Sequence, residues 1–197
     1  MYFCQERKVA FFMPTRTGST TLKNIFDSWG LATVEGKRHC LPEDAQNFIP
    51  DIAEYKTYGF FRDPLERYLS CIRLLQQKHQ YMQQSFESDA IVKKLTIGMD
   101  YVTMMEIASH ISDERAFMFR PQVDWLANCE LLDFDNYTAE ILKIARMFDK
   151  TQIKIQRHNH TDRSLVSAPC DEVKAFVREK YAADYALAKD RLGKEYA

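Results

Sequence analysis

One short segment constrains the fold of this chain more than any other: an apolar run followed directly by a tight polar turn and an amphipathic helix. Residues 8–14 read KVAFFMP, which predicts a buried strand closed by proline. The turn TRTG follows at residues 15–18. Apolar residues then recur at the spacing of one helical face: Leu22, Ile25, Phe26 and Trp29. Gly30 is expected to end this helix. A strand, a loop and a helix in this order are typical of an α/β fold.

The same alternation of strands and helices continues along the chain. Further strands are predicted at residues 31–34, 57–61, 129–134 and 152–155. Helices are predicted at residues 42–48, from Pro64, across most of 76–119, at 137–148 and from Asp171 onward. We therefore expect a single domain over residues 1–197, with a P-loop-like, mainly parallel central sheet flanked by helices, a helical middle and a C-terminal helix.

Composition and charge exclude several classes of protein. The 197 residues are 46% hydrophobic, which is enough for a core and excludes a disordered chain. Lys and Arg number 27 against 28 Asp and Glu, so no broad basic face for nucleic acid is expected. The longest apolar run, Val9–Met13, is far shorter than the ~20 residues of a membrane span, and the N-terminus lacks the order of a signal peptide. The scattered cysteines, without a C-x-x-C pair, favour reduced thiols and a cytoplasmic protein with no membrane partner.

The turn at residues 15–18 has the composition of an anion-binding loop. Gly18 permits a tight turn and a close approach of the backbone to a ligand. Arg16 adds a fixed charge beside the positive end of the helix dipole. Hydroxyl side chains open the helix at Ser19, Thr20 and Thr21, where the alternative role is ordinary helix capping. The Walker A pattern G-x-x-x-x-G-K-[ST] does not occur.

A second motif follows the predicted strand TYGFF, which leads into RDPLERYLS. This motif and the earlier MPTRTGSTTL occur in the order found in the sulfotransferases that use 3′-phosphoadenosine 5′-phosphosulfate (PAPS), and the chain resembles their carbohydrate sulfotransferase branch. That family carries a 5′-phosphosulfate loop of the type P-[KR]-x-G-[ST]-T and a 3′-phosphate motif R-D-P-x-x-R-x-x-S. In this chain Thr15 follows Pro14, and Arg16 takes the basic position. The segments FRPQVDWL and YAADY resemble further, less specific family elements.

The resemblance implies transfer of a sulfuryl group from PAPS to a hydroxyl group of an acceptor. The acceptor is expected to be a carbohydrate. It assigns nucleotide binding to both motifs and to one arginine of a later polar loop: Arg16, Thr17, Gly18, Ser19, Thr20, Thr21, Arg62, Ser70 and Arg163. Arg16 is also expected to act in catalysis, by neutralising charge on the leaving phosphate oxygen. Arg120 and Gln122 are expected to face the acceptor. PAPS is the expected co-substrate, and no metal is expected.

The acceptor hydroxyl needs a general base, and His39 is the best candidate. It lies between the two motifs, and imidazole titrates near neutral pH. The alternative is a loop histidine without a catalytic role. His158 and His160 have no partner at zinc-ligand spacing, so a solvated loop is the better interpretation there.

Two other functions stay open at this point. A P-loop-type nucleotide kinase or other phosphotransferase would share the strand–loop–helix arrangement, although the missing Gly-Lys-[Ser/Thr] ending counts against it. A catalytically degenerate nucleotide-binding protein would keep the fold and lose turnover. Arg62 could also serve as a surface ion pair with Asp63 or Glu66.

Overall fold

The computed structural model describes residues 1–34, 38–77, 117–155 and 169–196. The chain divides into two compact units. The sheet unit comprises residues 1–63, 121–159 and 183–197, and the helical unit comprises residues 64–120 and 160–182. The chain passes from the sheet unit into the helical unit and back twice, so neither unit is one continuous segment. The single domain expected over residues 1–197 stays a prediction.

The sheet unit is built on a five-stranded mixed sheet with the strand order β3-β1-β2-β4-β5. Its strands are β1 (Tyr2–Cys4), β2 (Val9–Phe11), β3 (Ala32–Thr33), β4 (Lys56–Phe61) and β5 (Glu130–Asp133). β2, β4 and β5 run parallel to one another, whereas β1 is antiparallel to both β2 and β3. The three parallel strands therefore end at the same edge.

Strand β2 and the residues after it are buried on both faces of the sheet. Val9, Phe11 and Met13 belong to the core on one face, and Ala10 and Phe12 to the core on the other. A strand covered on both faces has no solvent side that would favour polar residues. This explains why residues 8–14 read as a continuous apolar run.

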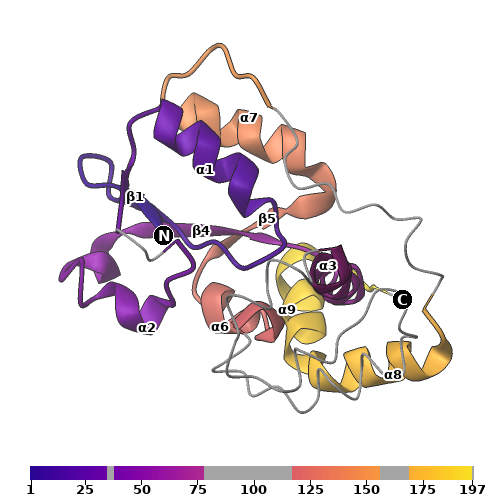
Figure 1. The fold of residues 1–197 in the computed structure, drawn as a ribbon. Coiled ribbons are helices and arrows are strands. Elements are labelled where there is room, and N and C mark those ends of the chain that lie inside the picture. Colours follow the sequence, from indigo (N-terminus) through magenta and orange to yellow (C-terminus); the bar gives the residue numbers. More distant parts are fainter. Residues whose placement is uncertain (35–37, 78–116, 156–168, 197) are drawn as a thin grey trace. The chain divides into compact units, whose positions relative to one another are not determined.

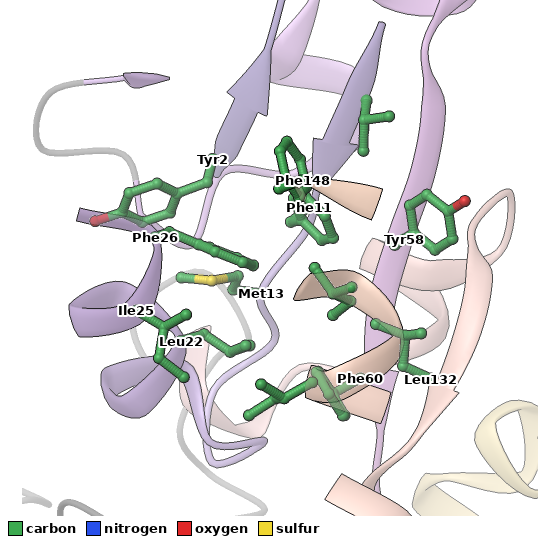
Figure 2. Packing of buried hydrophobic residues seen from close by; sticks show 13 residues of the cluster. Tyr2, Phe11, Met13, Leu22, Ile25, Phe26, Tyr58, Phe60, Leu132 and Phe148 are labelled. Atoms are coloured by element: carbon green, nitrogen blue, oxygen red, sulfur yellow. The ribbon is translucent and has the colours of Figure 1, made fainter. Parts of the chain in front are cut away.

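Helices cover both faces (Figure 1). On one face, α1 (Ser19–Ser28) and α7 (Tyr137–Met147) pack over the first core, shown in Figure 2. The buried members of the first core are Tyr2, Val9, Phe11, Met13, Leu22, Ile25, Phe26, Tyr58, Phe60, Leu132, Ile141, Ile144 and Phe148. On the other face, α2 (Pro42–Ala45), α6 (Val123–Leu126) and α9 (Ala182–Leu192) contribute to the second core. The second core includes Ala10, Phe12, Cys40, Ala45, Ile49, Tyr55, Phe61, Trp125, Leu126, Cys129 and Ala188.

In the helical unit, α3 (Pro64–Gln77) packs against α8 (Asp171–Lys180) and the short 3-10 helix Phe117–Phe119. Tyr68 of α3 is central to these contacts, because its ring centroid lies 5.7 Å from that of Phe119, 5.9 Å from Phe176 and 6.3 Å from Tyr181. The Tyr181 hydroxyl donates a hydrogen bond to the Phe119 carbonyl at 2.8 Å. Aromatic packing thus joins three segments that are distant in the sequence.

The predicted α/β class is confirmed, but the sheet is mixed where a mainly parallel one was expected. The difference comes from β1, which no sequence pattern predicts because three residues are too few to show a period. Only residues 5–8 connect β1 to β2, and a connection this short can join antiparallel neighbours but not parallel ones.

Two other expectations need correction, and a third falls on residues outside the described ones. Residues 151–155 form no strand, so the strand predicted at 152–155 is wrong; Ile153 and Ile155 alternate because they pack against the first core. The helix predicted from Asp171 is two helices, since Tyr181 leaves the helical conformation at φ −110° and ψ 27°. Of the helical middle predicted across 76–119, residues 78–116 lie outside the described residues.

Replacement of Gly59 tests the close packing of α6 on β4. A Cβ at Gly59 would overlap Leu126 Cδ2 and lie 2.9 Å from the Phe12 carbonyl oxygen. We expect Gly59→Ala to lower the free energy of unfolding in urea by about 1–3 kcal/mol, the usual cost of overpacking a core. Because the main overlap is with a side chain, the loss should shrink in a Leu126→Ala background. Equal losses in both backgrounds would contradict this packing.

Candidate functional site

The connections of the sheet diverge between β2 and β4. After β2 the chain continues through α1 to β3 on one side of the sheet order, and after β4 it arrives at β5 on the other side. α1, which follows β2, packs in the first core, and α6, which precedes β5, packs in the second core, so these two helices lie on opposite faces of the sheet. Open α/β sheets bind ligands at such a point, outside the carboxyl ends of the strands. The loop at residues 15–18 and Arg62 flank it.

The loop turns tightly because two of its residues adopt the left-handed backbone conformation. Arg16 has φ 62° and Gly18 has φ 78°. Glycine adopts this conformation without strain, whereas for arginine it costs free energy that surrounding contacts must offset. One such contact is the hydrogen bond from the fully buried Thr17 hydroxyl to the Pro14 carbonyl at 2.7 Å. The surrounding structure therefore holds the loop in one shape.

A tyrosine from α7 covers the glycine of this loop. The Tyr137 hydroxyl donates a hydrogen bond to the Gly18 carbonyl at 2.9 Å. A Cβ at Gly18 would lie 2.6 Å from the Tyr137 ring, so only glycine fits beneath it. Burial raises the pKa of Tyr137, although a hydrogen bond with Thr21 opposes the rise. The hydroxyl thus stays protonated at neutral pH and keeps its role as a donor.

The first turn of α1 is suited to an anion. Gly18 is the residue before the helix and provides no side-chain cap, and no acidic residue occurs in the first turn. The first N–H groups of a helix have no acceptor within the helix and carry its positive dipole end. Ser19 and Thr21 are buried here, whereas Thr20 is half-buried.

Arg62 links the end of β4 to the loop. Its Nη1 donates a hydrogen bond to the Arg16 carbonyl at 3.0 Å. Its guanidinium carbon lies 4.9 Å from the centroid of the Phe134 ring, which orients the planar group. Arg62, which opens the second motif, therefore contacts the loop of the first, 46 residues earlier in the chain.

The end of β5 contributes a carboxylate that is paired with a lysine. Asp133 accepts hydrogen bonds from Lys194 Nζ at 2.7 Å, from Asn136 Nδ2 at 2.7 Å and from the Asp135 N–H at 3.1 Å. Burial by itself would raise the pKa of Asp133, but these hydrogen bonds, that of Lys194 foremost, hold it below its ordinary value. The ammonium group of Lys194 also pairs with Asp135 Oδ2 at 2.6 Å, so this single positive charge is shared by two carboxylates near the end of β5.

Gln122 is fully buried, and its amide contacts the backbone of Arg62. Its Oε1 accepts from the Arg62 N–H at 3.0 Å, and its Nε2 donates to the Arg62 carbonyl at 2.7 Å. The sequence analysis placed Gln122 against the acceptor, but both ends of the amide are used inside the protein. A contact of Gln122 with an acceptor stays a prediction.

His39 is attached to the start of the same loop. Its Nδ1 lies 2.6 Å from the Met13 carbonyl oxygen, its Nε2 lies 3.2 Å from Arg38 Nε, and its carbonyl accepts from Trp125 Nε1 at 3.1 Å. A carbonyl oxygen only accepts and a guanidinium Nε–H only donates. These partners assign the hydrogen to Nδ1 and the lone pair to Nε2. In this tautomer the ring presents the Nε2 lone pair that a general base requires.

The remaining predicted residues belong to the helical unit or are not described. Ser70 is buried in α3 and Arg120 is half-buried after the 3-10 helix Phe117–Phe119, both in the helical unit. The contact of Ser70 with a 3′-phosphate and that of Arg120 with an acceptor stay predictions. Arg163 lies outside the described residues.

Three residues of this edge received no role from the sequence: Phe134, Tyr137 and Asp184. Phe134 could have been found, since it directly follows β5 and strand ends gather at this edge. Tyr137 has no local signal, because its partner Gly18 is 119 residues away. Asp184 lies in the YAADY segment, but that resemblance gives it no role, and its partner Gln122 is 62 residues away.

In the part of the chain that the structure describes, no group of three or more His, Cys, Asp or Glu side chains is arranged to hold a metal ion. Among the same residues, no helix has the length and apolar character needed to cross a membrane. No protein-family model, no curated protein and no solved structure matches the chain. The functional assignment therefore depends on the geometry of the site and on the resemblance of its two motifs.

Replacement of Gly18 by alanine tests the packing of Tyr137 on the loop. Gly30 offers a matched control, because it has a similar φ of 73° with nothing within 4 Å of its Cβ position. Gly30→Ala should cost about 1–2 kcal/mol for the left-handed conformation alone. Gly18→Ala should cost about 1–3 kcal/mol more, because the Tyr137 ring must also move. Urea denaturation measures both values, and equal losses would contradict the predicted clash.

Proposed function

We propose that this protein is a sulfotransferase that transfers the sulfuryl group of PAPS to the hydroxyl of a carbohydrate acceptor. The observation that carries the proposal is the hydrogen bond from Arg62 Nη1 to the Arg16 carbonyl. It joins the strand-end arginine of the 3′-phosphate motif to the loop of the 5′-phosphosulfate motif. The loop of the first motif and the arginine that opens the second flank the point between β2 and β4, where α/β sheets bind nucleotides.

The leaving side of the reaction is assigned to the loop. As the acceptor oxygen bonds to sulfur in line, the bond between sulfur and the bridging phosphate oxygen breaks, and negative charge grows on that oxygen. By analogy with phosphoryl transfer, the protein mainly positions the reactants and stabilises this charge. Arg16 and the first-turn N–H groups of α1 suit that role, because the surrounding contacts hold the loop in shape before the reaction.

The acceptor side is assigned to His39. Nε2 takes the proton of the acceptor hydroxyl as the oxygen attacks sulfur, which leaves imidazolium, a sulfate ester and 3′-phosphoadenosine 5′-phosphate. The Met13 carbonyl then faces Nδ1–H and stabilises the charged ring. Arg38 donates to Nε2 in the structure, so the acceptor hydroxyl takes the place of the Arg38 Nε–H when it binds.

A nucleotide comparison separates this proposal from its competitors. A thermal-shift assay with 3′-phosphoadenosine 5′-phosphate and with ATP should show a larger stabilisation by the former, whereas a nucleotide kinase would prefer ATP. Transfer from PAPS to a panel of carbohydrates then distinguishes an enzyme from a binding protein. Binding of the bisphosphate without transfer to any acceptor would favour the degenerate nucleotide-binding protein.

Arg62→Ala tests the recognition of the 3′-phosphate. A charge-assisted hydrogen bond contributes about 1.5–3 kcal/mol, so affinity for 3′-phosphoadenosine 5′-phosphate should fall by roughly 10- to 150-fold in calorimetry. Adenosine 5′-phosphosulfate, which lacks the 3′-phosphate, should bind almost as before. Arg191→Ala is the matched control, because Arg191 also donates to a backbone carbonyl, that of Cys129 at the opposite end of β5. Equal losses for both ligands would make Arg62 a structural residue.

His39→Ala tests the general base. Turnover should fall by about 10²- to 10⁴-fold while nucleotide affinity stays near that of the wild type. The wild-type rate should also fall at acid pH, because protonation removes the Nε2 lone pair, and the variant should lack this ionisation. His39→Asn is the control for structure, since its amide N–H can donate to the Met13 carbonyl in place of Nδ1. A variant that kept most of its turnover with an unchanged pH profile would exclude His39 as the base.

A further inference from the structure

A fully buried carboxylate lies behind the anion site. Asp184, near the start of α9, accepts two backbone hydrogen bonds, from Gln122 N to Oδ2 at 2.8 Å and from Val123 N to Oδ1 at 2.8 Å. Gln122 Nε2 lies 3.5 Å from the same Oδ2. An isolated carboxylate is costly to bury, and these hydrogen bonds offset that cost. Asp184 therefore fixes both the peptide and the side chain of Gln122.

Gln122 passes this constraint to Arg62. Arg62 is the first residue after β4, where the ladder with β5 has ended at the pair Phe61 and Asp133. At this position the Gln122 amide bonds to both the N–H and the carbonyl of Arg62. An amide that uses its donor and its acceptor on one residue sets the orientation of that residue's backbone. The direction in which the Arg62 side chain leaves the sheet follows from it.

We propose that Gln122 and Asp184 are positioning residues that hold Arg62 in the orientation required for anion binding. The inference rests on the proposed function for the identity of the anion, the 3′-phosphate of the nucleotide, but the hydrogen-bonded chain itself does not depend on that identity. Arg62 then meets the ligand without first losing backbone freedom, which is how preorganisation raises affinity. Neither residue touches the ligand.

A double-mutant cycle tests this chain through nucleotide affinity. Gln122→Met keeps the length of the side chain and removes both hydrogen bonds, and it should weaken 3′-phosphoadenosine 5′-phosphate by about tenfold in calorimetry. In the Arg62→Ala background the same substitution should change affinity by less than about twofold, because there is no guanidinium left to position. Asp184→Asn should behave in the same way. The two backbone N–H groups each need an acceptor oxygen, and an amide has only one oxygen. Equal weakening in both backgrounds would overturn the proposal.

Leu126→Ala is the control for a general loss of stability. Leu126 is fully buried in α6, the helix whose start Asp184 caps, and has no part in the hydrogen-bonded chain. Its truncation should destabilise the protein by urea denaturation and change nucleotide affinity by less than about twofold. If Leu126→Ala weakened binding as much as Gln122→Met, the effect of Gln122 would be structural and the positioning role would be wrong.

Amide hydrogen exchange gives a readout that needs no ligand. In Gln122→Met the Arg62 amide should exchange faster, while the amides of β4 keep their protection; unchanged protection of Arg62 would overturn the proposal. If the wild type binds no 3′-phosphoadenosine 5′-phosphate, the proposed function fails, and the cycle is run with inorganic pyrophosphate. Coupling between Gln122 and Arg62 there would uphold the positioning role without the sulfotransferase. No coupling, or no binding of either anion, would overturn it.

Discussion

The parallel pairing of β2 with β4 is the interaction on which the rest of the sheet unit depends. The pairing runs from Val9 opposite Lys56 to Phe11 opposite Tyr58, and the Phe12 N–H extends it with a hydrogen bond to the Tyr58 carbonyl at 2.8 Å. Helices cover both faces of these strands, so apolar burial stabilises the pairing from two sides. Because the strands are parallel, the loop after β2 and Arg62 after β4 emerge at the same edge.

Backbone conformation at this edge is costly, and contacts from distant parts of the chain stabilise it. Arg16 lies in the left-handed region, and Gly18 is covered by a tyrosine from α7. Arg62 is held by a buried amide that a buried carboxylate holds in turn. Strained backbone lowers the net stability of a protein, which is small. Such strain is typical of sites where binding requires a fixed geometry.

The charges at this edge favour an anion. Arg16, Arg62 and the dipole of α1 are positive, and the carboxylate of Asp133 is paired with Lys194, which Asp135 shares. The neutral form of His39 adds a lone pair at the same strand–loop junction without adding a charge. The positive groups suit an anionic sulfuryl donor, and the lone pair of His39 suits the hydroxyl of an acceptor. Group transfer from a phosphosulfate requires both.

The sequence alone determined the strand before residue 15, the loop, the helix after it and the strand before Arg62, because hydrophobic period and turn chemistry act over a few neighbouring residues. It also singled out Arg16, Gly18, His39 and Arg62 by residue type and order. Only the tertiary structure decided which of them meet. Three hydrogen bonds join residues that are 46 to 119 positions apart: Arg62 to the loop, Tyr137 to Gly18, and Arg62 to Gln122. Such contacts depend on how strands pair and helices pack, which no local pattern records.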